Sequence, residues 1–196
     1  MKGQQEALSA ILITTVLIGV VGSVYFWGLP LVQKNKDITT LENSESFMRK
    51  LDEKIKYIAN NGGREQMKIS VPGVVTFDAI NEKIELAVNT QGVIYAVAAE
   101  IPLGMNDCSS EKGTLGVERA EVLCVRSDKI ADNNYITKYI LSYLELTQGR
   151  ISYKIDLTSA TGETMSSGMD HFLVIENKGS VVDGNLIKTV IEINII

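Results

Sequence analysis

Hydrophobic residues dominate the chain from Ala7 to Gln33, and this stretch carries no charged side chain. About 27 residues, at a rise of about 1.5 Å each, make a helix of roughly 40 Å, which exceeds the roughly 30 Å hydrocarbon core of a bilayer. Tyr25 and Trp27 lie near its far end, and such side chains favour a membrane interface. The pattern therefore predicts a membrane-spanning helix, which is too long for an ordinary cleaved signal peptide.

The pattern changes over 38–59, where apolar residues recur at intervals of three and four. This spacing predicts an amphipathic helix whose apolar face consists of Leu41, Phe47, Met48, Leu51, Ile55 and Ile58. Pro30 can kink a helix without ending it, whereas Asn60-Asn61-Gly62-Gly63 is a clear stop signal. One long helix, kinked near Pro30, is therefore expected to run to residue 59.

Beyond Gly63, apolar and polar residues alternate, which is typical of half-buried strands. Strands are expected at 83–88, 151–157 and 186–196, with more deeply buried strands at 93–99 and 172–175. Turn signals separate them, at Pro72-Gly73, Gln91-Gly92, Gln148-Gly149, Asn177-Lys178-Gly179 and Asp183-Gly184-Asn185.

Two segments are harder to assign. The segment 108–132 is expected to be a loop region with one short strand. The segment 135–147 fits a strand pair or a helix, and its Tyr, Ile and Thr content favours strands. Roughly eight strands behind one long helix indicate an α+β protein with an antiparallel β-sandwich or barrel-like head domain.

The acidic balance of the chain narrows the choice of partners. The 196 residues carry a net charge of -5. Nucleic acids and anionic membrane surfaces both attract cations, so neither is indicated as a partner.

The two cysteines, Cys108 and Cys124, are either a disulfide or two buried thiols. A membrane helix in front of the domain suggests an extracellular location, where disulfides persist. A bridge would close a loop of about 17 residues and stabilise the fold by roughly 3 kcal/mol. The polar, Gly-containing segment between the cysteines favours the disulfide.

No catalytic, cofactor-binding or metal-binding pattern stands out, so neither an enzyme nor a cofactor is expected. His171 follows Asp170, but a lone His of this kind is usually a strand-edge residue, and two Cys with one His do not make a zinc site. An oxygen-rich cluster fits a solvated loop better than a calcium site, and it consists of Asp128, Asp132, Asn133 and Asn134. Four tyrosines are expected to pack in the sheets rather than form a surface patch, namely Tyr135, Tyr139, Tyr143 and Tyr153.

The N-terminus resembles one known group of proteins. Lys2-Gly3, followed by Gln4-Gln5-Glu6-Ala7-Leu8-Ser9-Ala10-Ile11 and the long apolar run, is similar to the start of archaeal type IV pilins and archaellins, which carry a class III signal peptide. The segment 22–36 also resembles the helix exit in these proteins. The resemblance covers residues 1–36.

This resemblance implies that a prepilin peptidase cuts between Gly3 and Gln4, with Lys2 and Gly3 as recognition residues. The chain then divides into a leader peptide (1–3), a helix (4–59, apolar over 7–33 and amphipathic over 38–59) and a β-rich head domain (64–196). The apolar part serves first as a transmembrane helix and then as filament core.

The implied function is that of a structural subunit of an extracellular type IV pilus-like filament at the cell surface. The precursor is held in the cytoplasmic membrane, and the partners are other copies of the chain, the peptidase and the pilus assembly machinery. The alternatives are a minor pilin, an archaellum accessory protein, or a permanently membrane-anchored surface binding domain.

Small residues within the apolar run are candidates for helix packing. Gly19, Gly22 and Ser23 lie together, and such residues let helices approach closely, although a simple anchor can contain them incidentally. Glu6 is the third residue of the implied mature chain, where the family often has Ser and places Glu at the fifth position. Its carboxylate can neutralise the new amino terminus in an apolar environment, or remain solvated and favoured by the helix dipole.

Overall fold

The computed structural model describes residues 2–160 and 165–196, with side chains over 9–160 and 168–196. One helix, α1 (Lys2–Asn61), precedes the strands. The first six strands are β1 (Arg64–Lys68), β2 (Val74–Asp78), β3 (Lys83–Thr90), β4 (Glu100–Pro102), β5 (Lys112–Thr114) and β6 (Glu121–Ala131). The others are β7 (Asn134–Tyr143), β8 (Glu145–Gln148), β9 (Ile151–Thr158), β10 (Met165–Ser167), β11 (Phe172–Asp183) and β12 (Leu186–Ile195).

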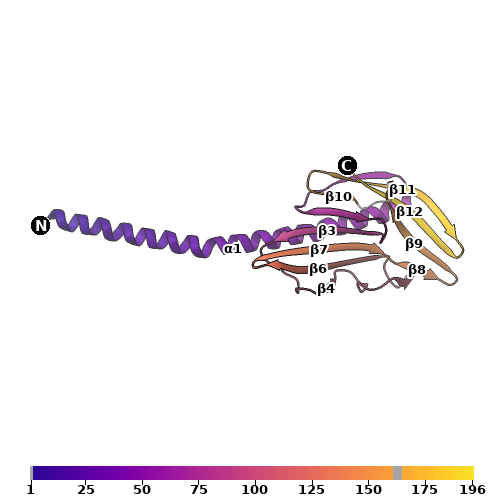
Figure 1. Ribbon diagram of the computed structural model, residues 1–196, viewed down its shortest axis with the longest axis horizontal. Coiled ribbons are helices and arrows are strands. Elements are labelled where there is room, and N and C mark those ends of the chain that lie inside the picture. The colour runs from indigo at the N-terminus through magenta and orange to yellow at the C-terminus, as the bar shows by residue number, and fades with distance from the viewer. Residues whose placement is uncertain (1, 161–164) are drawn as a thin grey trace.

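The helix α1 is continuous over its 60 residues, and its first half projects away from the strands (Figure 1). Pro30 lies inside it without interrupting it, and Figure 1 shows only a shallow bend about half-way along. The helix ends at Asn61, two residues beyond the expected end, and the stop signal is confirmed at Gly62 and Gly63. These glycines adopt positive φ angles of 74° and 97°, a conformation that glycine enters without steric penalty. The Gly62 N–H donates back to the Ile58 carbonyl at 2.8 Å, which closes the last turn.

The strands form two six-stranded sheets, so the class α+β is confirmed. The order in the first sheet is β1-β11-β12-β9-β8-β5, and in the second sheet it is β10-β2-β3-β7-β6-β4. The second sheet is antiparallel throughout, but in the first sheet β12 pairs with β9, and β5 with β8, in parallel. The expectation of an antiparallel head therefore holds for the second sheet and is wrong for these two pairings of the first sheet. After β9 the chain passes through β10 in the other sheet, and it returns with the β11–β12 hairpin, so β12 runs in the same direction as β9.

The second half of α1 contacts both sheets and completes their common core. All six residues of its predicted apolar face are at most 3% exposed, so this prediction is confirmed for Leu41, Phe47, Met48, Leu51, Ile55 and Ile58. They pack in one cluster with residues of the second sheet, such as Phe77 and Leu141, and of the first sheet, such as Ile175 and Ile193. Each fully buried side chain of this size contributes roughly 1.5–3 kcal/mol, so the helix and the two sheets depend on one another.

Strands at 83–88, 151–157 and 172–175 are confirmed within β3, β9 and β11, and the strand expected at 186–196 is β12, which ends at Ile195. The segment 135–147 forms strands rather than a helix, but its two strands, β7 and β8, belong to different sheets and do not pair with each other. The segment 93–99 is not a buried strand, because Val97 makes only one isolated bridge, to Ser127, and is 45% exposed. β2 and β7 occupy both positions beside β3, and the segment lies instead along β6, which it contacts at Val97 and through the hydrogen bond from the Ala98 N–H to the Ser127 carbonyl at 2.7 Å.

The region 108–132 contains an eleven-residue strand, β6, where only a short strand was expected. Its first residues are buried on both faces, because Leu123 and Val125 face the main core while Val122 and Cys124 lie in a second apolar cluster. A strand covered on both faces lacks the alternation that reveals a half-buried strand.

The predicted turn at Asn177-Lys178-Gly179 is instead a bulge within β11, where the pairing with β12 shifts between Asn177 and Ser180. The bulge turns the Asn177 side chain toward the end of α1. Its amide donates to the carbonyls of Ile58 and Ala59 at 3.0 and 3.3 Å. It thus satisfies the Ala59 carbonyl, which lies at the helix end, and adds a second donor to the Ile58 carbonyl, which already accepts from Gly62. The turn residues are therefore used to cap the helix.

Replacement of Leu51 by alanine tests the dependence of the head on the helix. Leu51 is fully buried, so Leu51→Ala leaves a cavity between the sheets and lowers the free energy of unfolding by about 2–5 kcal/mol. Urea unfolding of the full chain in detergent, followed by near-UV circular dichroism, measures the loss. Leu17→Ala is the matched control, because Leu17 is 58% exposed on the projecting half of the same helix. An equal loss in both variants would contradict the assigned role of Leu51.

Candidate functional site

The projecting half of α1 receives no cover from the rest of the chain. Over 9–36 every side chain is exposed, except at two half-buried positions, Gly28 and Gln33. Phe26 and Trp27 are 78% and 81% exposed. A window of this helix reaches a mean hydropathy of 2.1, and in the part of the chain that is described α1 alone is long and apolar enough to cross a membrane. So large an apolar surface is unfavourable in water, and lipid or other protein chains have to cover it.

Three hydroxyl groups on this half of the helix are satisfied within the helix itself. Thr14, Thr15 and Ser23 each donate to the carbonyl oxygen four residues earlier, at 2.8 Å. These three hydroxyl donors therefore do not need water. The projecting half is therefore compatible with an environment that offers no hydrogen-bond partners.

Gly22 leaves a hollow on the surface of the projecting half. The hollow has a volume of about 410 Å³ and is lined by Leu17, Ile18, Val21, Gly22 and Tyr25. A Cβ atom added at Gly19 or Gly22 meets no atom of the chain within 4 Å. A larger side chain thus fits at either position in a single subunit, and any steric conflict would have to come from another molecule.

The predicted processing site lies at the N-terminal end of α1. The backbone of α1 is helical from Lys2 onward, so it includes Gly3, Gln4 and Glu6. Their side chains lie outside the described residues, and the cut after Gly3 stays a prediction.

Asp37 marks the border between the projecting half and the half inside the head. It is only 6% exposed, and its Oδ2 accepts hydrogen bonds from the N–H groups of Gln91 and Gly92 at 3.1 and 2.9 Å. The other oxygen accepts from the Gln33 amide at 2.9 Å. Two backbone donors hold a buried carboxylate firmly, so the loop after β3 is fixed to the helix at this residue.

A second polar contact fixes the helix further along. Lys56 forms ion pairs with Asp52 at 2.7 Å and with Glu121 of β6 at 3.0 Å, and both carboxylates are only 9% exposed. The Tyr143 hydroxyl donates to Asp52 at 3.1 Å. Burial raises the pKa of Asp52, and the hydrogen bond from Lys56 opposes this rise. Burial also acts to lower the pKa of Lys56, but hydrogen bonds to Asp52 and Glu121 outweigh it and raise that pKa.

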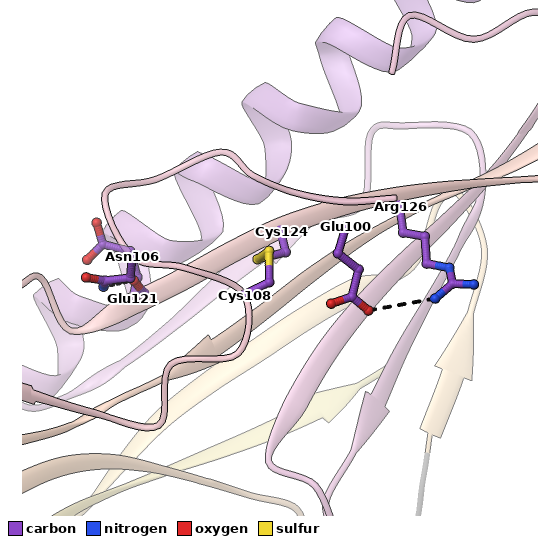
Figure 2. The surroundings of a disulfide bond; sticks show 6 residues. All are labelled: Glu100, Asn106, Cys108, Glu121, Cys124 and Arg126. Carbon is purple, nitrogen blue, oxygen red and sulfur yellow. Dashed lines mark hydrogen bonds and ion pairs between the residues drawn. A yellow bond between two sulfur atoms is a disulfide. The ribbon is translucent and has the colours of Figure 1, made fainter. Parts of the chain in front are cut away.

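The disulfide lies beside this network. Cys108 and Cys124 are joined, with their Cα atoms 5.8 Å apart, which is the pairing that the sequence favours. Figure 2 shows Glu121, Cys124 and Arg126 following one another along β6, with Asn106 next to Glu121. The Asn106 amide donates to the carbonyls of Arg119 and Glu121 at 2.8 and 2.6 Å. The bridge and this amide together hold the 103–118 segment against β6.

The other candidate residues do not come together into a site. His171 is exposed, and the neighbouring Asp170 forms an ion pair with Lys68 at 2.9 Å. Asp128 pairs with Arg126, and Asp132 pairs with Lys129. Among the described residues, no group of three or more His, Cys, Asp or Glu side chains is arranged to hold a metal ion. Tyr139 and Tyr143 are buried in the core, as the packing interpretation expects.

Sequence reasoning missed the polar residues that fix the helix. Asp37, Ser44 and Asp52 are buried although they are polar. The sequence could have predicted their burial, because these three residues follow the same three- and four-residue spacing as Leu41 and Met48 of the apolar face. A polar residue on the buried side of an amphipathic helix indicates a specific partner in the head.

Comparison with protein-family models, curated proteins and solved structures finds no match for this chain.

Replacement of Lys56 by methionine tests the buried ion pairs. Lys56→Met leaves Asp52 and Glu121 without their cation and lowers the free energy of unfolding by about 2–3 kcal/mol, less than for a fully buried pair because Lys56 is 30% exposed. Asp52→Asn in the same chain removes one uncompensated charge and restores part of the loss. Urea unfolding of the four combinations gives the coupling between the two positions. Lys50→Met, which changes an exposed lysine of the same helix, should have little effect.

The buried tyrosines predict that stability falls at alkaline pH. Burial raises the pKa of Tyr139 and Tyr143 above their ordinary value near 10 and raises that of Tyr95 to about 12. Their stabilising contribution is complete below pH 10 and is lost above it, because the unfolded chain then releases phenolic protons that the folded chain retains. The free energy of unfolding should fall by up to about 1.4 kcal/mol per pH unit for each such group.

Tyr143→Phe should reduce this alkaline slope, even though it lowers stability at neutral pH. Tyr57→Phe is the control, because Tyr57 is 58% exposed and its replacement should leave the slope unchanged. Urea unfolding between about pH 9 and about pH 11 measures the slopes. Equal slopes in wild type and Tyr143→Phe would contradict the prediction.

Proposed function

We propose that this chain is a structural subunit of an extracellular type IV pilus-like filament, with a precursor held in the cytoplasmic membrane. The observation that carries the proposal is the contrast between the two halves of α1. One half is bare over 9–36 and apolar up to residue 33, and the other is buried in the core of the head. The partners are other copies of the chain, the prepilin peptidase and the assembly machinery.

The rigidity of the connection supports this proposal. The helix passes from the bare half into the head without a break, and Asp37 fixes it to the loop after β3 immediately behind the last apolar residues. The head therefore cannot fold back to cover the apolar surface. In the membrane, lipid covers the bare half, and in the filament the same surface is covered by neighbouring helices.

The two sheets form, in this proposal, a sandwich or barrel-like head around the second half of the helix. The inward residues of both sheets and the helix belong to one apolar cluster, which supports this arrangement. The head coats the filament, and the Cys108–Cys124 bridge is suited to an oxidising extracellular environment.

A permanently anchored surface domain is the main alternative, since a single span suits both functions. Processing and assembly discriminate between them. We expect the protein from its native cell to begin at Gln4, which intact mass measurement detects, and to be the dominant component of shed filaments under the electron microscope. Retention of residues 1–3 would contradict the filament proposal.

Gly22→Leu tests whether the bare half packs against copies of itself. The new side chain has open space in a single subunit, so insertion and folding should be unchanged, while filament yield should fall strongly because close helix approach is blocked. Val20→Leu is the control, because it adds bulk at a position that is already large and 55% exposed. Filament yield by sedimentation and membrane insertion by carbonate extraction are measured in parallel. Normal filaments from Gly22→Leu would count against helix packing at this position.

A further inference from the structure

A polar pocket lies at the neck, where α1 enters the head. Its volume is about 540 Å³. Amide and lysine side chains dominate its lining, contributed by Gln33 and Lys36 of α1, Asn89 and Gln91 at the end of β3, and Asn133 and Asn134 at the β6–β7 turn. Three separate parts of the chain therefore direct hydrogen-bonding groups to one place.

Most of these amides have no partner within the protein. In the described part of the chain, the side chains of Asn89, Asn133 and Asn134 make no hydrogen bond. Each offers two N–H donors and a carbonyl acceptor. Convergent amides of this kind match adjacent hydroxyl groups, which also donate and accept. The pocket therefore suits a polyhydroxylated ligand.

The charges of the pocket favour an uncharged ligand. The Asp37 carboxylate is already engaged by Gln33 and by the N–H groups of Gln91 and Gly92. Lys36 is then the one other charged group on the wall, as far as the described residues show. A single exposed lysine in a chain of net charge -5 is a weak site for a phosphate, so hydroxyl groups are the better match.

The position of the pocket indicates what carries these hydroxyl groups. A span of about 20 residues that begins at Ala7 reaches the vicinity of Trp27. Gln33 lies six residues further, or about 9 Å along the helix, whereas the headgroup layer on each side is roughly 5–8 Å thick. The pocket thus lies at the outer edge of the headgroups, where the sugar of a glycosylated lipid extends. Ile130 belongs to the same β6–β7 hairpin as Asn133 and is 55% exposed.

We propose that the neck pocket binds the uncharged, polyhydroxylated headgroup of a membrane glycolipid while the precursor is in the bilayer. The inference rests on the membrane-held precursor of the proposed function, and filament assembly is not required for it. The bound headgroup accepts and donates hydrogen bonds with Asn89, Asn133 and Asn134, while Asp37 keeps the loop after β3 in place.

Native mass spectrometry of the full chain tests this proposal. The protein is reconstituted into nanodiscs of phosphatidylcholine with a diglycosyl diacylglycerol, and the lipid that it retains in mild detergent is identified. We expect retention of the glycolipid over phosphatidylcholine, and about tenfold lower retention for the double variant Asn89→Ala and Asn134→Ala, because several hydrogen bonds are lost. The single variant Asn134→Ala provides a second, milder change.

Asn185→Ala is the matched control, since Asn185 is an exposed asparagine at the β11–β12 turn, away from the pocket. Equal retention in the double variant and in the control overturns the site. If phosphatidylglycerol is retained as well as the glycolipid, the ligand need not be uncharged, and that part of the proposal is overturned. If the free disaccharide displaces the glycolipid at equal affinity, the ligand need not be a lipid, and that part is overturned.

Failure of this inference and failure of the proposed function have different readouts. If the chain retains the glycolipid but is neither cut after Gly3 nor assembled, the pocket proposal is supported and the filament proposal is contradicted. If the chain is cut and assembled but does not retain the glycolipid, only the pocket proposal is contradicted. If the chain does not insert into nanodiscs, both proposals are contradicted.

Discussion

Burial of one half of a single continuous helix is the interaction on which the rest of this structure depends. Leu41, Met48, Leu51, Ile55 and Ile58 are completely buried between the helix and two sheets, so the sheets have no complete core without α1. The same helix continues without a break into an apolar half that nothing in the described structure covers. The stability of the head thus forces the bare half to project into its surroundings. An apolar rod that is fixed in this way has to be covered by lipid or by protein.

Apolar burial alone does not determine where the helix sits along the sheets, because the hydrophobic effect has no direction. The polar contacts supply this information at three levels, through Asp37, through Lys56 with Asp52 and Glu121, and through Asn177 at the end of the helix. A shift of one helical turn, about 5.4 Å, would break all three. Buried ion pairs add little net stability, so the register of the helix is the more direct reason for their presence.

The sequence was informative where local periodicity decides the structure. The spacing of Leu41 to Ile58 predicted the buried face correctly, and alternation predicted β3, β9 and β12. It failed where distant parts of the chain decide. The segment 93–99 is apolar but makes only an isolated bridge to β6, and β6 itself is buried on both faces by segments that the sequence does not show to be adjacent. The parallel pairing of β9 with β12, the helix cap by Asn177 and the neck pocket depend on the same long-range placement.

In the proposed function the bare half moves from a bilayer to a bundle of helices, and this transfer would leave the hydrogen bonds of Thr14, Thr15 and Ser23 unchanged because they lie within the helix. Lipid tails are as apolar as the side chains that they cover, so hydrophobicity does not distinguish the two environments either. In the proposed filament, close packing is the interaction that distinguishes the two environments, and the small residues Gly19, Gly22 and Ser23 are the positions where we expect it to act. A headgroup in the neck pocket would oppose this transfer by its own binding free energy. Such a ligand is compatible with assembly only if it binds weakly, at an affinity closer to millimolar than to nanomolar, roughly 4 rather than 12 kcal/mol.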